Sequence, residues 1–243
     1  MSSPAKPAAR SPAYLRIASQ LRDRIEAGEL TTGALLPSER ELAVDFGVSR
    51  MTARHALMVL EHEGYVQRET PRGTFVASPR LLMRIGSFSD EVVRSGATPG
   101  DRLLWAERQQ ATRGVADALD LRKGTAVNVV QRLRTADDTP VAIETTYFPA
   151  RLTPGLLDQP LVGSLWAIVR RRHGIAAARA TASLEVITLD EGSAKLLSAR
   201  NAASAVLVTR RTYDGAGRPF EYARDIYRAD RVEFQVAAEI PPA

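Results

Sequence analysis

Residues 46–57 read FGVSRMTARHAL and contain a tight joint between two short helices. Gly47 suits the left-handed conformation that closes a helix, and Ser49 suits the N-cap of the next helix. At 100° per residue, one side of that next helix is apolar and consists of Ala53, Ala56, Leu57 and Leu60. The opposite side is mostly polar and basic and carries Arg50, Met51, Arg54, His55 and Met58. The stretch therefore predicts a helix over about 49–63 with one buried face and one open face.

The segments around this stretch complete a small module. A helix over about 13–27 is predicted by the apolar spacing of Tyr14, Ile17, Ala18, Leu21 and Ile25. Ser38 and Glu41 form the pattern of a capping box, which predicts a helix over about 38–46. GYVQR (64–68) and GTFVA (73–77) favour two short strands joined by a turn. Three helices followed by a β-hairpin make residues 12–78 a winged helix-turn-helix.

Such a module favours double-stranded DNA as a partner. The helix at 49–63 fits the major groove, where the guanidinium of Arg50 matches the O6 and N7 atoms of guanine. Ser38 and Ser49 stand at helix starts, which suit phosphate oxygens. At the hairpin tip, Arg72 and Gly73 suit the minor groove, since arginine is attracted there and glycine permits close approach. A solvated face without a ligand is the alternative for these side chains.

The composition limits the remaining possibilities. A chain of 243 residues with 44% hydrophobic residues can bury a core and divides into about two domains. It has no cysteine and only three scattered histidines, so no metal site or other cofactor is expected. No signal peptide or long apolar run appears, so we expect a cytoplasmic protein with no membrane segment, beginning with a disordered arm over 1–11. The net charge of +5 divides into +2 for residues 1–80 and +3 for the rest, so charge alone locates no DNA-binding face.

The second half contains an internal repeat. Residues 114–148 can be laid over residues 192–227, with RTAD at 134–137 against RTYD at 211–214. Each copy reads as helix, strand, turn and strand, so two hairpins predict an antiparallel sheet with helices on a face. This is an α+β domain, expected over 87–243 after a linker at 79–86.

Charged and hydroxyl side chains converge in this second domain. Helices are predicted at 87–96 and 160–174, with Ser87 or Ser89 and Ser164 near their starts, where backbone N–H groups can hold an anion. Arg132 and Arg134 alternate along one strand and share a face. Glu144 on the return strand can join them. A salt-bridged structural cluster and a ligand site both remain open.

The first domain resembles the DNA-binding domain of the GntR family of bacterial regulators. The matching residues include LPSERELA (36–43), FGVSR (46–50), EGYV (63–66) and GTFVA (73–77). The resemblance implies base contacts from Arg40, Arg50 and Gly73, and phosphate contacts from Ser38, Ser49, Thr52 and Arg54. Pro71 departs from the family pattern, which has a glycine there, so a stiffer wing is expected.

Residues 87–237 resemble the effector-binding UTRA domain of the HutC subfamily of GntR regulators. The motifs are RLRTAD (132–137), TPVAIETTYF (139–148), GSL (163–165) and RRTYDGAGRPFEYARDIYRADR (210–231). The resemblance implies a chorismate lyase-like fold and effector contacts from Phe88, Ser89, Arg132, Arg134, Glu144, Ser164 and Tyr227. Trp166 stands where the family often has tyrosine.

These observations lead to one functional hypothesis and two alternatives. We expect a homodimeric, ligand-responsive transcription factor, a repressor that binds an inverted-repeat operator and responds to a small anionic effector. A phosphosugar or a small carboxylic acid would suit the donors. An enzyme acting on a small anionic metabolite is one alternative, although no nucleophile–base pair is visible. A protein-interaction adaptor that uses the winged helix for docking is the other.

Overall fold

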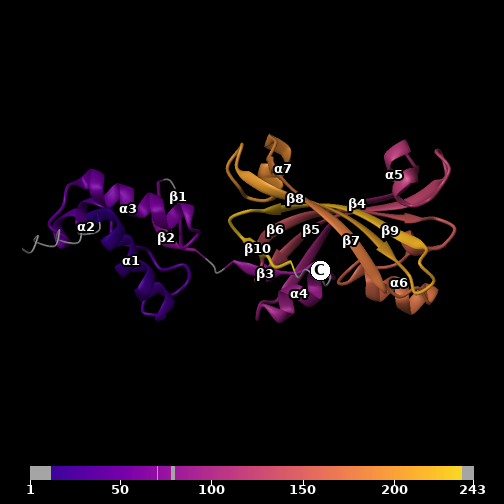
Figure 1. Ribbon diagram of the computed structural model, residues 1–243, viewed down its shortest axis with the longest axis horizontal. Helices are drawn as coiled ribbons and strands as arrows, with labels where there is room; N and C mark the ends of the chain where they lie inside the picture. Colours follow the sequence, from indigo (N-terminus) through magenta and orange to yellow (C-terminus); the bar gives the residue numbers. More distant parts are fainter. Residues whose placement is uncertain (1–11, 70, 78–79, 237–243) are drawn as a thin grey trace, which may run out of the picture. The chain divides into compact units, whose positions relative to one another are not determined.

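The chain forms two compact units, Met1–Arg80 and Leu81–Ala243. The computed structural model describes residues 12–69, 71–77 and 80–236 (Figure 1). The arm expected over 1–11 therefore lies outside the described residues. Each unit has its own hydrophobic core and is considered by itself below.

The first unit is the winged helix-turn-helix that the sequence predicts. Its elements are α1 (Ala13–Glu26), α2 (Glu39–Asp45), α3 (Arg50–His62), β1 (Val66–Glu69) and β2 (Gly73–Val76). β1 and β2 pair antiparallel as the wing. The expected helix limits agree with the observed ones to within two residues, because local side chains cap these helices.

Both predicted caps are formed. Ser38 accepts a hydrogen bond from the backbone N–H of Glu41 over 3.3 Å, and the Glu41 carboxylate accepts one from the Ser38 N–H over 2.8 Å. Ser49 accepts from the Thr52 N–H over 3.1 Å and starts α3. Gly47, with φ of +61°, lies between the two helices in the left-handed conformation. The joint between α2 and α3 therefore follows from two local residues, Gly47 and Ser49.

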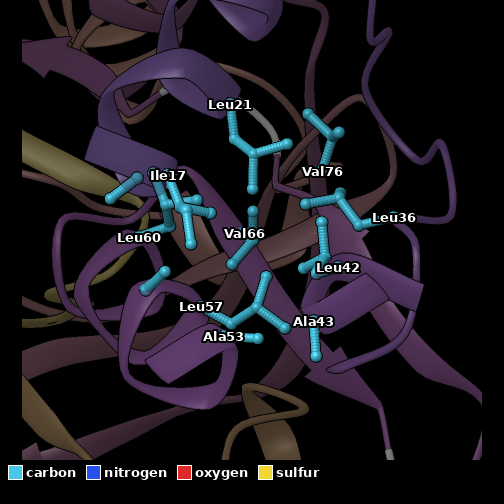
Figure 2. Packing of buried hydrophobic residues seen from close by; sticks show 12 residues of the cluster. Ile17, Leu21, Leu36, Leu42, Ala43, Ala53, Leu57, Leu60, Val66 and Val76 are labelled. Atoms are coloured by element: carbon cyan, nitrogen blue, oxygen red, sulfur yellow. The ribbon is translucent and has the colours of Figure 1, made fainter. Parts of the chain in front are cut away.

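The core of the first unit is built from the predicted apolar faces (Figure 2). The four residues of the inner face of α3, namely Ala53, Ala56, Leu57 and Leu60, are at most 1% exposed. They pack with Ile17 and Leu21 of α1 and with Val66 and Val76 of the wing. Burying a leucine or isoleucine side chain contributes about 1.5–3 kcal/mol, so this core fixes the outward face of α3.

The second unit contains a six-stranded antiparallel sheet in the order β4-β5-β6-β9-β8-β7. The strands are β4 (Pro99–Gln110), β5 (Ala126–Ala136), β6 (Thr139–Pro149), β7 (Arg179–Thr188), β8 (Ser204–Tyr213) and β9 (Pro219–Arg228). The four inner strands are those predicted from the repeat, and the two edge strands were missed. No residue of β4 or β7 is fully buried. β4 lacks the alternation of polar and apolar residues that reveals a half-buried strand, whereas residues 179–186 of β7 do alternate and offer a signal that the sequence analysis missed.

Helices cover both faces of this sheet. α4 (Phe88–Arg94) and α6 (Leu165–His173) lie on one side, and α5 (Arg113–Ala118) and α7 (Glu191–Leu196) lie on the other (Figure 1). A 3-10 turn, η1 (Leu156–Asp158), precedes α6. Each half of the unit thus repeats a strand, a helix and a hairpin, which extends the sequence repeat by one strand.

The cross-strand register corrects the sequence overlay of the two copies. Arg132 pairs with Glu144 in the first hairpin, and Arg210 pairs with Ala223 in the second. Pro140 and Pro219 pair with Thr135 and Tyr213, so the second turn is one residue longer than the first. The structural equivalent of Arg132 is therefore Arg210, whereas the overlay placed Arg134 against Arg211.

The expected linker at 79–86 is too long. β3 (Leu81–Met83) pairs in parallel with β10 (Val232–Phe234) and belongs to the second unit. Three residues are too short for a periodic signal, and their partner lies near the other end of the chain. Among the residues that the structure describes, no helix is long and apolar enough to cross a membrane.

Candidate functional site

A small recess, partly open to solvent, lies in the second unit. Its lining comes from the starts of α4 and α6 and from β5, β6, β8 and β9, namely Ser87, Phe88, Ser89, Arg132, Arg134, Glu144, Ser164, Leu165, Trp166, Arg210 and Glu221. Six of the seven residues expected at the effector site are in this set. The exception is Tyr227, which is 5% exposed and lies behind Phe88, with ring centroids 6.4 Å apart.

Arg132 is held from several directions. Its Nε donates to Glu144 Oε2 over 3.0 Å, and its Nη1 donates to the carbonyl oxygens of Gly163 over 2.7 Å and Leu161 over 3.2 Å. Its side chain is 1% exposed. The strand register produces this contact, because Arg132 and Glu144 are directly opposed on β5 and β6.

Arg134 reaches from β5 to the start of α4. Its Nη2 donates to Ser89 Oγ over 2.8 Å, and its guanidinium lies 4.5 Å from the centroid of the Phe88 ring. Its Nη1 lies 3.5 Å from Glu144 Oε2. Its Nε, however, is buried and has no hydrogen-bond partner among the described residues. Burial lowers the pKa of Arg134, and Glu144 opposes that effect.

Glu144 is the shared partner of both arginines. Burial alone would raise the pKa of its carboxyl, but Arg132 and Arg134 outweigh burial and hold that pKa below its ordinary value. Glu144 is therefore a carboxylate at neutral pH. Two carboxylates oppose the two arginines, because Asp101 lies 3.9 Å from Arg132 in addition to Glu144.

The opposite wall contains a second group of charges that the sequence analysis missed. Arg210 Nη2 lies 3.2 Å from Glu221 Oε1, and Arg210 Nη1 lies 3.4 Å from Asp225 Oδ2. Asp225 is directly opposite Glu144 across β6 and β9. Burial raises the pKa of Asp225 to about 8, even though Arg210 acts to lower it. Counting cross-strand pairs back from Pro219 would have identified Arg210 as the counterpart of Arg132 in the second hairpin.

Trp166 completes the recess from α6. The Arg210 guanidinium lies 5.2 Å from the centroid of its ring, within the range of a cation–π contact. Ser164 caps this helix and accepts from the Ala167 N–H over 3.3 Å. Its hydroxyl also lies 3.2 Å from that of Ser87, which joins the start of α6 to the start of α4.

The first unit presents its expected DNA-binding residues on the surface. Arg40 of α2 and Arg50, Arg54 and His55 of α3 are exposed, and Thr52 is half-buried. The hydroxyls of Ser49 and Thr52 lie 2.9 Å apart. His55 stacks on Tyr14, with ring centroids 3.9 Å apart, so its ring is oriented by α1. Met51, which was not among the expected contacts, is 70% exposed beside Arg50.

The wing has a glycine where side chains are poorly tolerated. Gly73 has φ of +125°, and a Cβ there would come within 2.7 Å of Leu35 Cδ1. The Arg72 guanidinium lies 5.3 Å from the centroid of the Phe75 ring. The exposed tip can therefore approach a ligand through its backbone.

Together, a winged helix-turn-helix with an exposed basic helix and an α+β domain with a charged recess define a class. This is the class of DNA-binding transcriptional regulators that carry an effector-binding domain. Residues 13–76 match the family of bacterial regulatory proteins named gntR, and residues 94–233 match the UTRA domain. The chain belongs to the GntR family and carries a UTRA domain.

Similar proteins agree with this assignment. The HTH-type transcriptional repressor NagR of Bacillus subtilis is 36% identical over 92% of this chain and 93% of its own length. The HTH-type transcriptional repressor PhnF of Mycolicibacterium smegmatis is 34% identical over 87% of both chains. The crystal structure of PhnF from Mycobacterium smegmatis covers 93% of this chain and 100% of its own, with a TM-score of 0.67 and 32% identity. These relatives are transcriptional regulators, so the enzyme alternative is not supported.

Proposed function

We propose that this protein is a cytoplasmic repressor of the HutC type that binds an inverted-repeat operator as a homodimer. A small anionic effector in the recess of the second unit would change its affinity for DNA. A coupling of about 1–3 kcal/mol between the two sites is the usual range for such a response. The repressor assignment is supported by the names of the relatives NagR and PhnF.

The effector proposal rests on the buried guanidinium of Arg134, which has an unpaired N–H donor among the described residues. This arginine is buried at the recess, and its Nε lacks a partner among the described residues. The Ser89 hydroxyl lies beside it, and Phe88 covers its guanidinium. A buried unpaired donor is unfavourable, and an anionic oxygen would satisfy it. Arg132, Glu144 and Ser164 would complete the anion site, with Tyr227 supporting Phe88 from behind.

The chemical class of effector follows from these donors. A guanidinium, hydroxyls and the backbone N–H groups at the start of α6 suit a phosphate or a carboxylate. A phosphosugar and a small carboxylic acid both satisfy this requirement.

The DNA contacts are proposed for the outer face of α3 and its surroundings. Arg40, Arg50 and Gly73 would reach base edges, while phosphates would lie near Ser38, Ser49, Thr52, Arg54 and His55. Arg72 would enter the minor groove. Two such modules related by a twofold axis would read the two halves of a palindromic site in double-stranded DNA.

A two-stage experiment tests this proposal with the full chain. First, duplexes are selected from a random pool, and the enriched sequence should be an inverted repeat bound by two chains. Then the affinity for that duplex is measured while phosphorylated sugars and small carboxylic acids are added. We expect one of these compounds to change the affinity by about 5- to 150-fold.

Arg134→Ala separates the two sites in this experiment. The variant should bind the selected duplex as the wild type does and should lose the effector response. An enriched site without twofold symmetry would refute the dimeric operator. A full effector response in the Arg134→Ala variant would refute the anion site.

A further inference from the structure

Trp166 is a hydrogen-bond donor in the recess without a partner among the described residues. It is the second residue of α6, and it lines the recess beside Arg210. Its Nε1 is buried and finds no acceptor in the described part of the chain. An indole N–H can only donate, and such groups usually find a partner when they are buried. A ligand oxygen is the partner that the recess can accept at this position.

The segment before α6 borders the proposed anion site, since Arg134 Nη1 donates to the Gly163 carbonyl oxygen over 3.2 Å. The Trp166 side chain, however, lies against Arg210. Arg134 belongs to β5, whereas the neighbour of Trp166 is Arg210 on β8. β6 and β9 separate these two strands, so at strand spacings of about 4.7–4.9 Å their backbones are about 14 Å apart. The two unpaired donors belong to different residues, so a ligand that satisfies both Arg134 and Trp166 needs at least two acceptor oxygens.

The charges around Trp166 decide the nature of the second group. Arg210 is the nearby cation, and its Nη atoms already lie 3.2 Å from Glu221 and 3.4 Å from Asp225. Any further negative charge at this wall would meet the Glu221 carboxylate beside a cation that Glu221 already neutralises. An uncharged oxygen, such as a hydroxyl or a carbonyl, can accept the indole N–H without that repulsion.

We infer that Trp166 is a specificity-determining residue that donates its indole N–H to an uncharged oxygen of the effector. The effector then carries its anion at the Arg134 wall and a neutral hydroxyl or carbonyl group at the Trp166 wall. This inference rests on the proposed effector function and deepens it. It excludes simple inorganic anions and short diacids as full effectors, because neither offers an uncharged acceptor at the second wall.

Two probes test the inference by titration calorimetry with the full chain. Glucose 6-phosphate carries an anion and uncharged hydroxyls, whereas inorganic phosphate carries the anion alone. Trp166→Phe keeps an aromatic ring over Arg210 and removes the donor. We expect this variant to bind glucose 6-phosphate about five- to twentyfold more weakly and to bind inorganic phosphate as the wild type does.

Trp105→Phe is the matched control, because Trp105 and Trp166 are the two tryptophans of the chain. Trp105 Nε1 donates to Gln131 Oε1 over 2.9 Å. Gln131 precedes Arg132 on β5 and therefore points to the opposite face of the sheet. The control should bind both probes normally. Its remaining fluorescence should change when glucose 6-phosphate is added, since Trp166 is then the only tryptophan.

Each outcome has a separate meaning. Equal affinity of the wild type and Trp166→Phe for glucose 6-phosphate would overturn the role of Trp166 while the anion site stands. That role is also overturned if Trp166→Phe weakens the binding of both probes equally, because a purely structural residue would have this effect. If neither probe binds the wild type, the anion site fails and this inference fails with it.

Discussion

Arg132 on β5 and Glu144 on β6 form a buried, directly opposed ion pair, in which Arg132 Nε donates to Glu144 Oε2 over 3.0 Å. The arginine side chain is 1% exposed and the glutamate side chain 11%. The same two residues line the recess. The salt-bridged cluster and the candidate ligand site, which the sequence left as alternatives, therefore share their residues.

Arg132→Ala should destabilise the second unit by about 3 kcal/mol. Removing one partner of a buried pair typically costs about 3–5 kcal/mol, because the other charge stays buried. The lower value is expected since Arg134 remains 3.5 Å from Glu144. Urea unfolding followed by tryptophan fluorescence measures this unit alone, as both tryptophans belong to it.

Arg113→Ala is the control for that measurement. Arg113 and Asp117 form a pair 3.9 Å apart whose side chains are 88% and 72% exposed. Such a pair contributes little, so the midpoint of unfolding should hardly move. If Arg132→Ala and Arg113→Ala lowered the free energy of unfolding by similar amounts, burial would not be what makes the Arg132–Glu144 pair strong.

Arg50→Ala should remove the preference for the operator and leave salt-sensitive, nonspecific DNA binding. A bidentate arginine–guanine contact discriminates by about 1–3 kcal/mol, while phosphate contacts do not depend on sequence. The affinities for the selected duplex and a scrambled duplex are compared at one salt concentration. Arg113→Ala removes an equal charge from the second unit and should keep the preference. If Arg50→Ala still discriminates, α3 is not the reading helix.

Ser38→Ala should destabilise α2 by about 0.5–2 kcal/mol, because it removes the side chain that caps this helix. Hydrogen exchange of the backbone amides of α2 measures the change. Exchange in α6 of the second unit is the internal reference and should be unaltered. Unchanged protection in α2 would show that the capping box contributes nothing in the intact protein.

In Glu41→Gln, the free energy of unfolding of the first unit should fall less steeply as the pH is lowered than it does in the wild type. The hydrogen bond from the Ser38 N–H holds the pKa of Glu41 below its ordinary value of 4.5. A carboxyl with a lowered pKa contributes stability above its unfolded pKa and loses that contribution as the pH falls through the folded pKa. Wild type and variant should therefore differ at about pH 6, and the difference should shrink as the pH falls below 4.5 and through the lowered folded pKa, when unfolding is followed by circular dichroism. A constant difference across this range would contradict the role of the Glu41 charge.

The stability of the Asp225→Asn variant relative to the wild type should increase as the pH rises. The pKa of Asp225 is raised by burial to about 8 from an ordinary value of 3.8, so the folded state holds a proton that the unfolded state releases. The wild type therefore loses stability from this group as the pH rises between these values, and asparagine does not. The free energy of unfolding of the variant, relative to wild type, should rise from about pH 5 to about pH 8. A flat difference would show that Asp225 is ionised in the folded protein throughout.

The sequence by itself determined the first unit and the inner half of the second. Capping residues such as Ser38 and Ser49 act within four residues, and the apolar face of α3 follows from its own period. The same local rule put Arg132 and Arg134 on one face of β5 and Glu144 opposite Arg132, because a hairpin pairs residues close in the chain.

Only the tertiary structure decided which distant segments meet. β3 pairs with β10 from near the other end of the chain, and the edge strand β4 shows no alternation of polar and apolar residues that would reveal it. The packing of α6 brings Trp166 over Arg210, and the sheet order β6-β9-β8 brings Arg210 toward the recess. Such contacts depend on the register and packing of whole elements, so they cannot be predicted from the local sequence pattern that predicts a helix.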